Sequence, residues 1–281
     1  MNKEGFYNFF YESRDEELVR SFDFSHSSLG YIHGELMDIQ KLKRIGELHI
    51  PEKFTGEISL PNLEVCDVIV ANKCTILHAP KLRTARQISC SGAESINLPS
   101  LIHCDDLFLG HALNIVLDSL AVAAKIINYR SKKCVIPKLK QVELIVLHGE
   151  IIELPSITNL FGSSYTSHSD FKNAKSIDLS NLESSMDSLS LPKVEGYLDL
   201  GKFKNCRGSI YCPSASKINL KSLEKSGSIM AKNAKEIIIN PNLDTSKDPN
   251  FGTSILDVPS SCYINTSGLA SKKVGRVLSK L

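Results

Sequence analysis

Histidine and aspartate side chains are the groups in this sequence whose types could do chemistry together. His111, His148 and His168 could each serve as a general base, and Asp105 or Asp106 could orient the imidazole. Such a pair would suit a hydrolase or a transferase. The sequence has no nucleophile elbow, no phosphate-binding glycine loop and no HExxH helix. An enzyme with a histidine-based site is therefore an alternative function and not the first.

Cysteine is the other residue type that could carry chemistry, because the chain has eight cysteines. No Cys-x-x-Cys pair occurs, and seven of the eight stand where equivalent segments carry Ala, Ser, Leu or Ile. A free cysteine behaves as a small buried hydrophobic residue. We predict packing for these thiols, no metal ligands and no cofactor, with a zinc or disulfide site as the alternative. This usage also fits a reducing compartment.

A nineteen-residue repeat must position all of these groups. Four-residue segments with leucine in fourth place begin at residues 60, 79, 98, 117 and 136, and most have proline second. A fixed period of this length is typical of a solenoid, in which each turn buries its apolar face against its neighbours.

Seven apolar or small positions keep register within each repeat. In one unit they are Cys104, Leu107, Leu109, Ala112, Ile115, Leu117 and Leu120. Pairs of positions two apart place both side chains on one face of a strand, and proline after the second pair ends that strand. Each turn is predicted to contain two short strands joined by two corners. About ten turns at ~4.8 Å each would form a rod roughly 50 Å long.

The segment from Cys104 to Ala112 resembles the LxxLxLxxN segment of the leucine-rich-repeat superfamily, with Ala112 in place of asparagine. The IxLPxL tail is similar to the BspA-like bacterial subclass. The resemblance covers roughly residues 42–243 and implies that the first strands line a concave binding face. We therefore expect a mainly β solenoid with parallel strands, leucine-rich-repeat-like or β-helix-like, capped at both ends. A single-stranded parallel β-helix is the alternative architecture.

Three regions follow along the chain. Residues 1–41, with an aromatic cluster and an acidic stretch, are expected to form a partly helical N-terminal cap. Residues 42–243 form the solenoid, interrupted by a polar insertion near 161–173. Residues 244–281 form a C-terminal cap and basic tail with apolar residues at helical spacing. That tail is also an alternative site of contact with a membrane surface or a partner.

Composition narrows the partners and the compartment. The formal net charge is +2, which argues against a dedicated nucleic-acid binder. No secretory signal follows Met1, and no apolar stretch is long enough to span a bilayer. We expect a cytoplasmic protein, with secretion into a host cell without a Sec signal as the alternative.

An outward-facing column on the first strand points to a function. It is rich in apolar and aromatic residues, which suits protein recognition. The column reads Val70, Ser89, Phe108, Ile127, Val146, Ser190, Tyr211 and Met230. The residues expected to contact a protein partner are Phe108, Ile127, Tyr129, Val146, His111, Arg130, His148 and Tyr211.

The apolar character of this column could also arise without a partner. β-Strands favour such residues in any context, and the N-terminal segment or the insertion could cover them. The expected function is a protein–protein interaction scaffold, with a bacterial effector delivered into a host cell as a further alternative.

Overall fold

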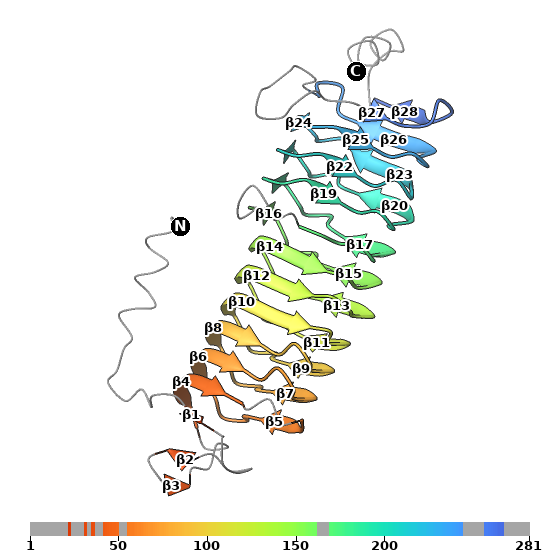
Figure 1. Cartoon of the computed structure of the whole chain (residues 1–281). Coiled ribbons are helices and arrows are strands. Elements are labelled where there is room, and N and C mark those ends of the chain that lie inside the picture. Colours follow the sequence, from red (N-terminus) through yellow and green to blue (C-terminus); the bar gives the residue numbers. More distant parts are fainter. Residues whose placement is uncertain are drawn as a thin grey trace.

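The chain winds into a rod of stacked turns, with β4 and β5 near one end and β27 and β28 near the other (Figure 1). The structure, a computed structural model, describes residues 42–50, 55–161, 169–243 and 256–266 and the strand segments 22–23, 31–32 and 35–36. Every element in these residues is a strand, and neighbouring turns pair in parallel. The predicted solenoid of about ten turns with parallel strands is confirmed.

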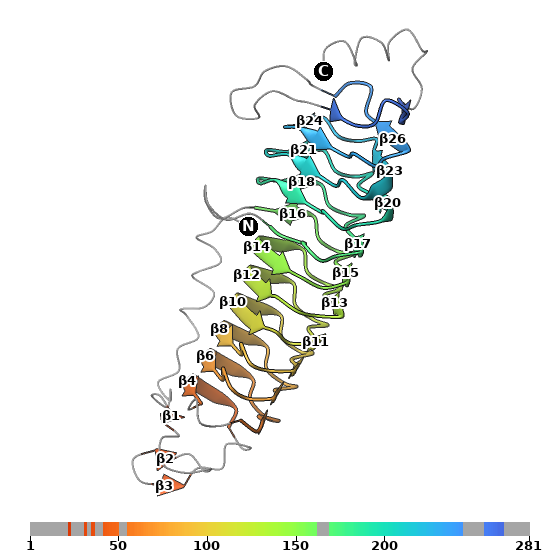
Figure 2. The same cartoon turned by 45° about the vertical axis from the view of Figure 1, so that its right-hand side comes forward.

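The first strand of each turn belongs to sheet 1, which runs along the rod (Figure 2). Its order is β24-β21-β18-β16-β14-β12-β10-β8-β6-β4-β1-β2-β3. The strands are β1 (Phe22–Asp23), β2 (Tyr31–Ile32), β3 (Glu35–Leu36), β4 (Arg44–His49), β6 (Val65–Val70), β8 (Thr84–Ser89), β10 (His103–Gly110), β12 (Val122–Asn128), β14 (Gln141–Leu147), β16 (Asn159–Leu160), β18 (Ser184–Ser185), β21 (Asn205–Cys206) and β24 (Lys225–Ser226). β1 pairs in parallel with β4, so it extends sheet 1 beyond the first turn.

The second strand of each turn forms sheet 2, in the order β17-β15-β13-β11-β9-β7-β5. These strands are β5 (Glu57–Ser59), β7 (Ile76–His78), β9 (Ser95–Asn97), β11 (Asn114–Val116), β13 (Lys133–Val135), β15 (Ile151–Glu153) and β17 (Ser176–Asp178). Two four-stranded sheets continue the rod, β19-β22-β25-β27 and β20-β23-β26-β28. Their strands are β19 (Leu189–Ser190), β20 (Gly196–Asp199), β22 (Ile210–Tyr211), β23 (Ala215–Leu220), β25 (Ile229–Met230), β26 (Glu236–Ile239), β27 (Leu256–Asp257) and β28 (Tyr263–Asn265).

The core is a set of ladders in which equivalent residues of successive turns stack. Ile88, Leu107 and Ile126 face one another across β8, β10 and β12, and all three are fully buried. A proline corner closes each turn, as where the Leu101 amide donates to the Leu98 carbonyl at 3.2 Å around Pro99. The seven predicted positions are therefore the residues that hold the turns together.

Cysteines fill these ladders as the sequence predicted. All eight thiols are free, and all except that of Cys262 are buried. Burial raises the pKa of the thiols of Cys66, Cys134, Cys206 and Cys212 to about 12. These thiols stay protonated and act as packing groups, because the thiolate is the form that reacts and binds metals.

Buried solenoid residues begin again within the range 161–173, where the sequence predicted an insertion. Residues 162–168 lie outside the described part of the chain, but Ser169 and Phe171 are both fully buried. Between them, Asp170 forms parallel bridges to Val146 on one side and Ser190 on the other. The repeat thus resumes at Ser169, five residues before Ala174, where the sequence pattern returns.

Sheet 2 is broken between β17 and β20, which form no ladder with each other. The spacing between equivalent leucine and phenylalanine positions is longer at this break. It is 19 residues from Leu101 to Leu120 but 21 from Leu182 to Phe203. The register of β20 and β23 shifts next to Gly196, whose φ of 70° lies in the left-handed region that favours glycine.

Several expectations about the ends fall outside the described residues. The helical parts expected in the N-terminal cap and in the tail after residue 266 lie outside the described residues, and the described segments between 22 and 36 are strands. Within the described ranges, no helix has the length and apolar character needed to cross a membrane.

Candidate functional site

Three neighbouring strands of sheet 1 bring the predicted apolar contact residues into one row. Phe108 of β10 pairs with Ile127 of β12, which pairs with Val146 of β14. Their neighbours in sequence, all leucine or isoleucine except Asn128, are fully buried, so alternation directs these three side chains outward. All three are half-buried. This register places the three outward side chains side by side on sheet 1.

The corner after these strands adds aromatic rings. The pairing register of β10 and β12 shifts between Phe108 and Gly110, and the Tyr129 amide donates to the Gly110 carbonyl at 2.6 Å. This irregularity brings His111 alongside Tyr129, with ring centroids 6.0 Å apart. A simple repeat of 19 residues has no such shift and would align His111 with Arg130.

Gly110 makes this corner possible. Its φ is 53°, and a Cβ atom built on it would lie far inside van der Waals contact with the carbonyl oxygen of Ser91 in the preceding turn. No real side chain tolerates so close an approach to a backbone atom. The chain can turn here only because glycine accepts the left-handed conformation and leaves the space next to Ser91 empty.

Tyr129 occupies the centre of the corner. Its ring lies between His111 and His148, and the centroids of Tyr129 and His148 are 5.5 Å apart at an interplanar angle of 65°. The edge-to-face geometry is one that aromatic pairs prefer. Tyr129 is nevertheless 47% exposed, so its ring presents a fixed apolar surface to solvent.

His148 has an acidic partner, but not one that the sequence indicated. Its Nε2 lies 3.1 Å from Oδ2 of Asp170, and the backbone of Asp170 is fixed by bonds to Ile145 and Leu147 at 2.9 Å each. The expected aspartates are engaged elsewhere: Asp105 bonds His103 at 3.0 Å, and Asp106 lies 3.9 Å from Lys125. His168 lies outside the described residues.

The two histidines of the enzyme hypothesis are thus on one corner, each in contact with Tyr129. The ring of Tyr129 lies between the rings of His111 and His148. His148 and Asp170 form the base and orienting carboxylate of a possible pair. This arrangement orients His148 against Tyr129 and thereby helps to fix the aromatic row.

The backbone of Arg130 is held by the buried side chain of Asn128. Asn128 has no exposed surface; its side-chain amide donates to the Ala112 carbonyl at 3.0 Å and its Oδ1 accepts from the Arg130 amide at 3.1 Å. Both sides of the Asn128 amide are satisfied, and the backbone of Arg130 is fixed while its side chain is exposed. We call the group Phe108, His111, Ile127, Tyr129, Arg130, Val146 and His148 the Tyr129 surface.

Tyr211 stands apart from this surface. It faces outward on β22 in the same row as Val146, but Asp170 and Ser190 come between them. The structure therefore brings seven of the eight predicted contact residues together and leaves Tyr211 further along the rod. Asp170 is the residue that the sequence missed, because it belongs to the segment that breaks the apolar pattern.

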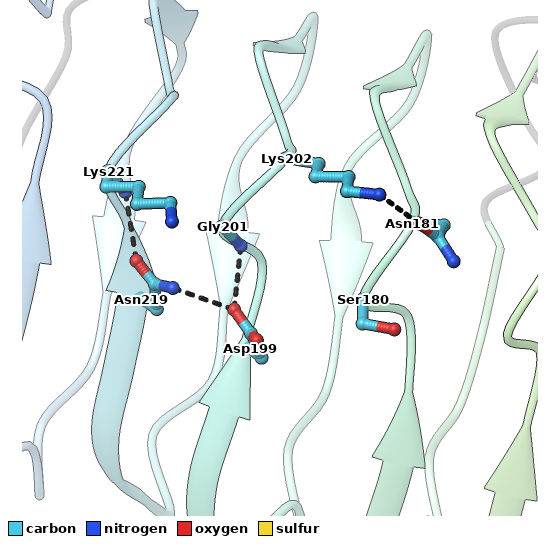
Figure 3. Close-up of a pocket in the computed structure, with 7 residues that line it drawn as sticks. All are labelled: Ser180, Asn181, Asp199, Gly201, Lys202, Asn219 and Lys221. Atoms are coloured by element: carbon cyan, nitrogen blue, oxygen red, sulfur yellow. Dashed lines mark hydrogen bonds between the residues drawn. The ribbon is translucent and has the colours of Figure 1, made fainter.

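A separate shallow cavity of about 240 Å³ lies where sheet 2 is broken (Figure 3). Asp199 accepts hydrogen bonds through Oδ1 from the Gly201 amide at 2.9 Å and from Nδ2 of Asn219 at 2.8 Å. The Nζ of Lys202 donates to Asn181, and the Lys221 amide to Oδ1 of Asn219. These bonds stabilise successive turns, which accounts for the polar character of this corner.

Neither a metal cluster nor a known relative adds to this description. Within the described ranges, no three His, Cys, Asp or Glu side chains are grouped so that they could hold a metal ion. No protein-family model matches the chain, and no relative is found among curated proteins.

Proposed function

We propose that the chain is a protein-binding module that engages a protein partner through the Tyr129 surface. The observation that carries this proposal is the exposed ring of Tyr129, fixed between two imidazoles beside a row of outward apolar side chains. Aromatic and arginine side chains supply most of the residues that dominate binding energy at protein interfaces. Rigid placement lowers the entropy lost when they bind.

The position of the surface supports the same proposal by analogy. It lies on β10, β12 and β14, the strands that correspond to the LxxLxL segments of leucine-rich repeats. Members of that superfamily use these strands for recognition. We extend that role to this chain as part of the proposal, together with the resemblance itself, because an analogy of architecture alone does not establish function.

Affinity capture from the source cells tests the proposal. Beads carrying Phe108→Ala or Tyr129→Ala should lose a partner that the wild type retains, because truncating an aromatic anchor typically costs about 2 kcal/mol or more, about thirtyfold in Kd. Tyr197→Ala is the matched control: Tyr197 is 53% exposed but lies on β20, away from the Tyr129 surface. If both surface variants fold and retain every partner of the wild type, the proposal is wrong.

A further inference from the structure

The turn that carries Tyr129 has an unusual charge. Every charged residue of this turn, residues 121–139, is basic, whereas the preceding turn carries only acidic residues and the next turn carries Lys140 and three glutamates. The basic residues are Lys125, Arg130, Lys132, Lys133 and Lys138. The acidic neighbours are Asp105, Asp106 and Asp118 in residues 102–120, and Glu143, Glu150 and Glu153 in residues 141–157.

Ion pairs between turns neutralise only part of this basic turn. Lys133 pairs with Glu153 at 2.7 Å, and Lys125 lies 3.9 Å from Asp106. Arg130 and Lys132 are both exposed, and neither has a carboxylate within 4.0 Å in the described part of the chain. Among the residues that the structure describes, two cations without an acidic partner thus follow Tyr129 within three positions of the sequence.

Nearby carboxylates on the same corner already have partners. Asp170 bonds His148 at 3.1 Å, and Glu150 lies 3.4 Å from Lys175. Arg130 is anchored through its backbone to Asn128, so its guanidinium starts from a fixed position. The Tyr129 surface therefore combines an apolar centre with a positive rim that the neighbouring turns do not neutralise.

We propose that the partner contacts the Tyr129 surface with an acidic peptide segment, an inference that rests on the proposed function. Its aspartate or glutamate side chains pair with Arg130 and Lys132, and an apolar or aromatic side chain packs against Tyr129 and Phe108. A guanidinium donates two parallel hydrogen bonds to a carboxylate, which gives such a contact both strength and orientation.

The charge arrangement favours a peptide over a nucleic acid. Neighbouring turns of the solenoid are ~4.8 Å apart, so the basic turn is a narrow band bordered on both sides by acidic residues. A phosphate backbone carries a negative charge on every nucleotide and would meet those acidic residues. A short peptide can place two or three carboxylates over the band and its apolar group beside it.

Selection from a displayed library of random dodecapeptides against the full-length chain tests this inference. Enriched peptides should combine several Asp or Glu residues with an aromatic or large aliphatic residue. The double variant Arg130→Glu/Lys132→Glu should weaken their binding by about tenfold or more at low salt, mainly through slower association. The matched control Lys138→Glu/Lys140→Glu makes the same change of charge at the other corner, where this turn passes into the next, and should leave Kd within about twofold.

The outcomes separate this inference from the proposed function. Enriched peptides without an acidic bias that lose binding in Tyr129→Ala would overturn the acidic partner and leave the surface in place. Peptides whose binding survives Tyr129→Ala would overturn both. Equal loss in the two charge-reversal variants would mean that overall charge and not this corner attracts the peptides, and would overturn the inference, as would the absence of any enrichment.

Discussion

Replacing Phe171 by alanine should lower the free energy of unfolding by about 3–5 kcal/mol, as measured by urea denaturation. Phe171 has no exposed surface and is among the largest fully buried side chains of the core. It stacks between turns, where the removal of a ring leaves a cavity that neighbours on a regular β scaffold cannot fill. The cost is therefore a loss of burial together with a cavity.

Phe161→Ala is the control for this prediction. Phe161 is the same residue type ten positions earlier, at the other side of the interrupted segment, but it is 43% exposed. Its removal should change the free energy of unfolding by less than about 1 kcal/mol. An equally small effect at Phe171 would mean that residues 169–171 belong to a surface insertion after all.

The second large effect is expected at Gly110. Gly110→Ala should cost about 3 kcal/mol or more, because the left-handed conformation alone costs roughly 1–2 kcal/mol and the new Cβ atom must also displace the Ser91 backbone. The displaced backbone carries the corner on which His111 and Tyr129 stand. The variant should therefore lose partner binding as well as stability, and urea denaturation combined with the capture assay measures both.

Gly196→Ala separates the two causes. Gly196 also has a positive φ, 70°, but nothing lies within 4 Å of a Cβ atom placed there. Its substitution should cost only the roughly 1–2 kcal/mol of the backbone conformation. Equal costs at the two glycines would show that the close approach to Ser91 is not a real constraint on the corner.

The architecture could be predicted because each buried position repeats. Leu107 and Leu109 share one face of a strand, and the same pair recurs in register in neighbouring turns. A periodic apolar pattern specifies which side chains face inward, and stacking then fixes the strand pairing. The outward direction of Phe108, Ile127 and Val146 follows from the same alternation.

What the repeat pattern missed are the places where the chain departs from it. Ser169 takes a core position that isoleucine or leucine fills in adjacent turns, so the turn containing Asp170 and Phe171 looked like an insertion. The shift after Phe108 depends on Gly110 and its approach to Ser91, a contact between turns that no spacing within one turn reveals. These two departures supply the Asp170 partner of His148 and the contact of His111 with Tyr129.

Photocrosslinking from the Tyr129 surface is the most direct test of the claim that this surface binds a protein. A benzoylphenylalanine placed at position 108 or 129 of the full-length chain replaces one aromatic side chain by another, and position 197 on β20 serves as the reference. On irradiation in the source cells, we predict a covalent adduct with one protein partner from positions 108 and 129 and none from position 197. Adducts from position 197 alone, or the same adducts from all three positions, would contradict the proposed function.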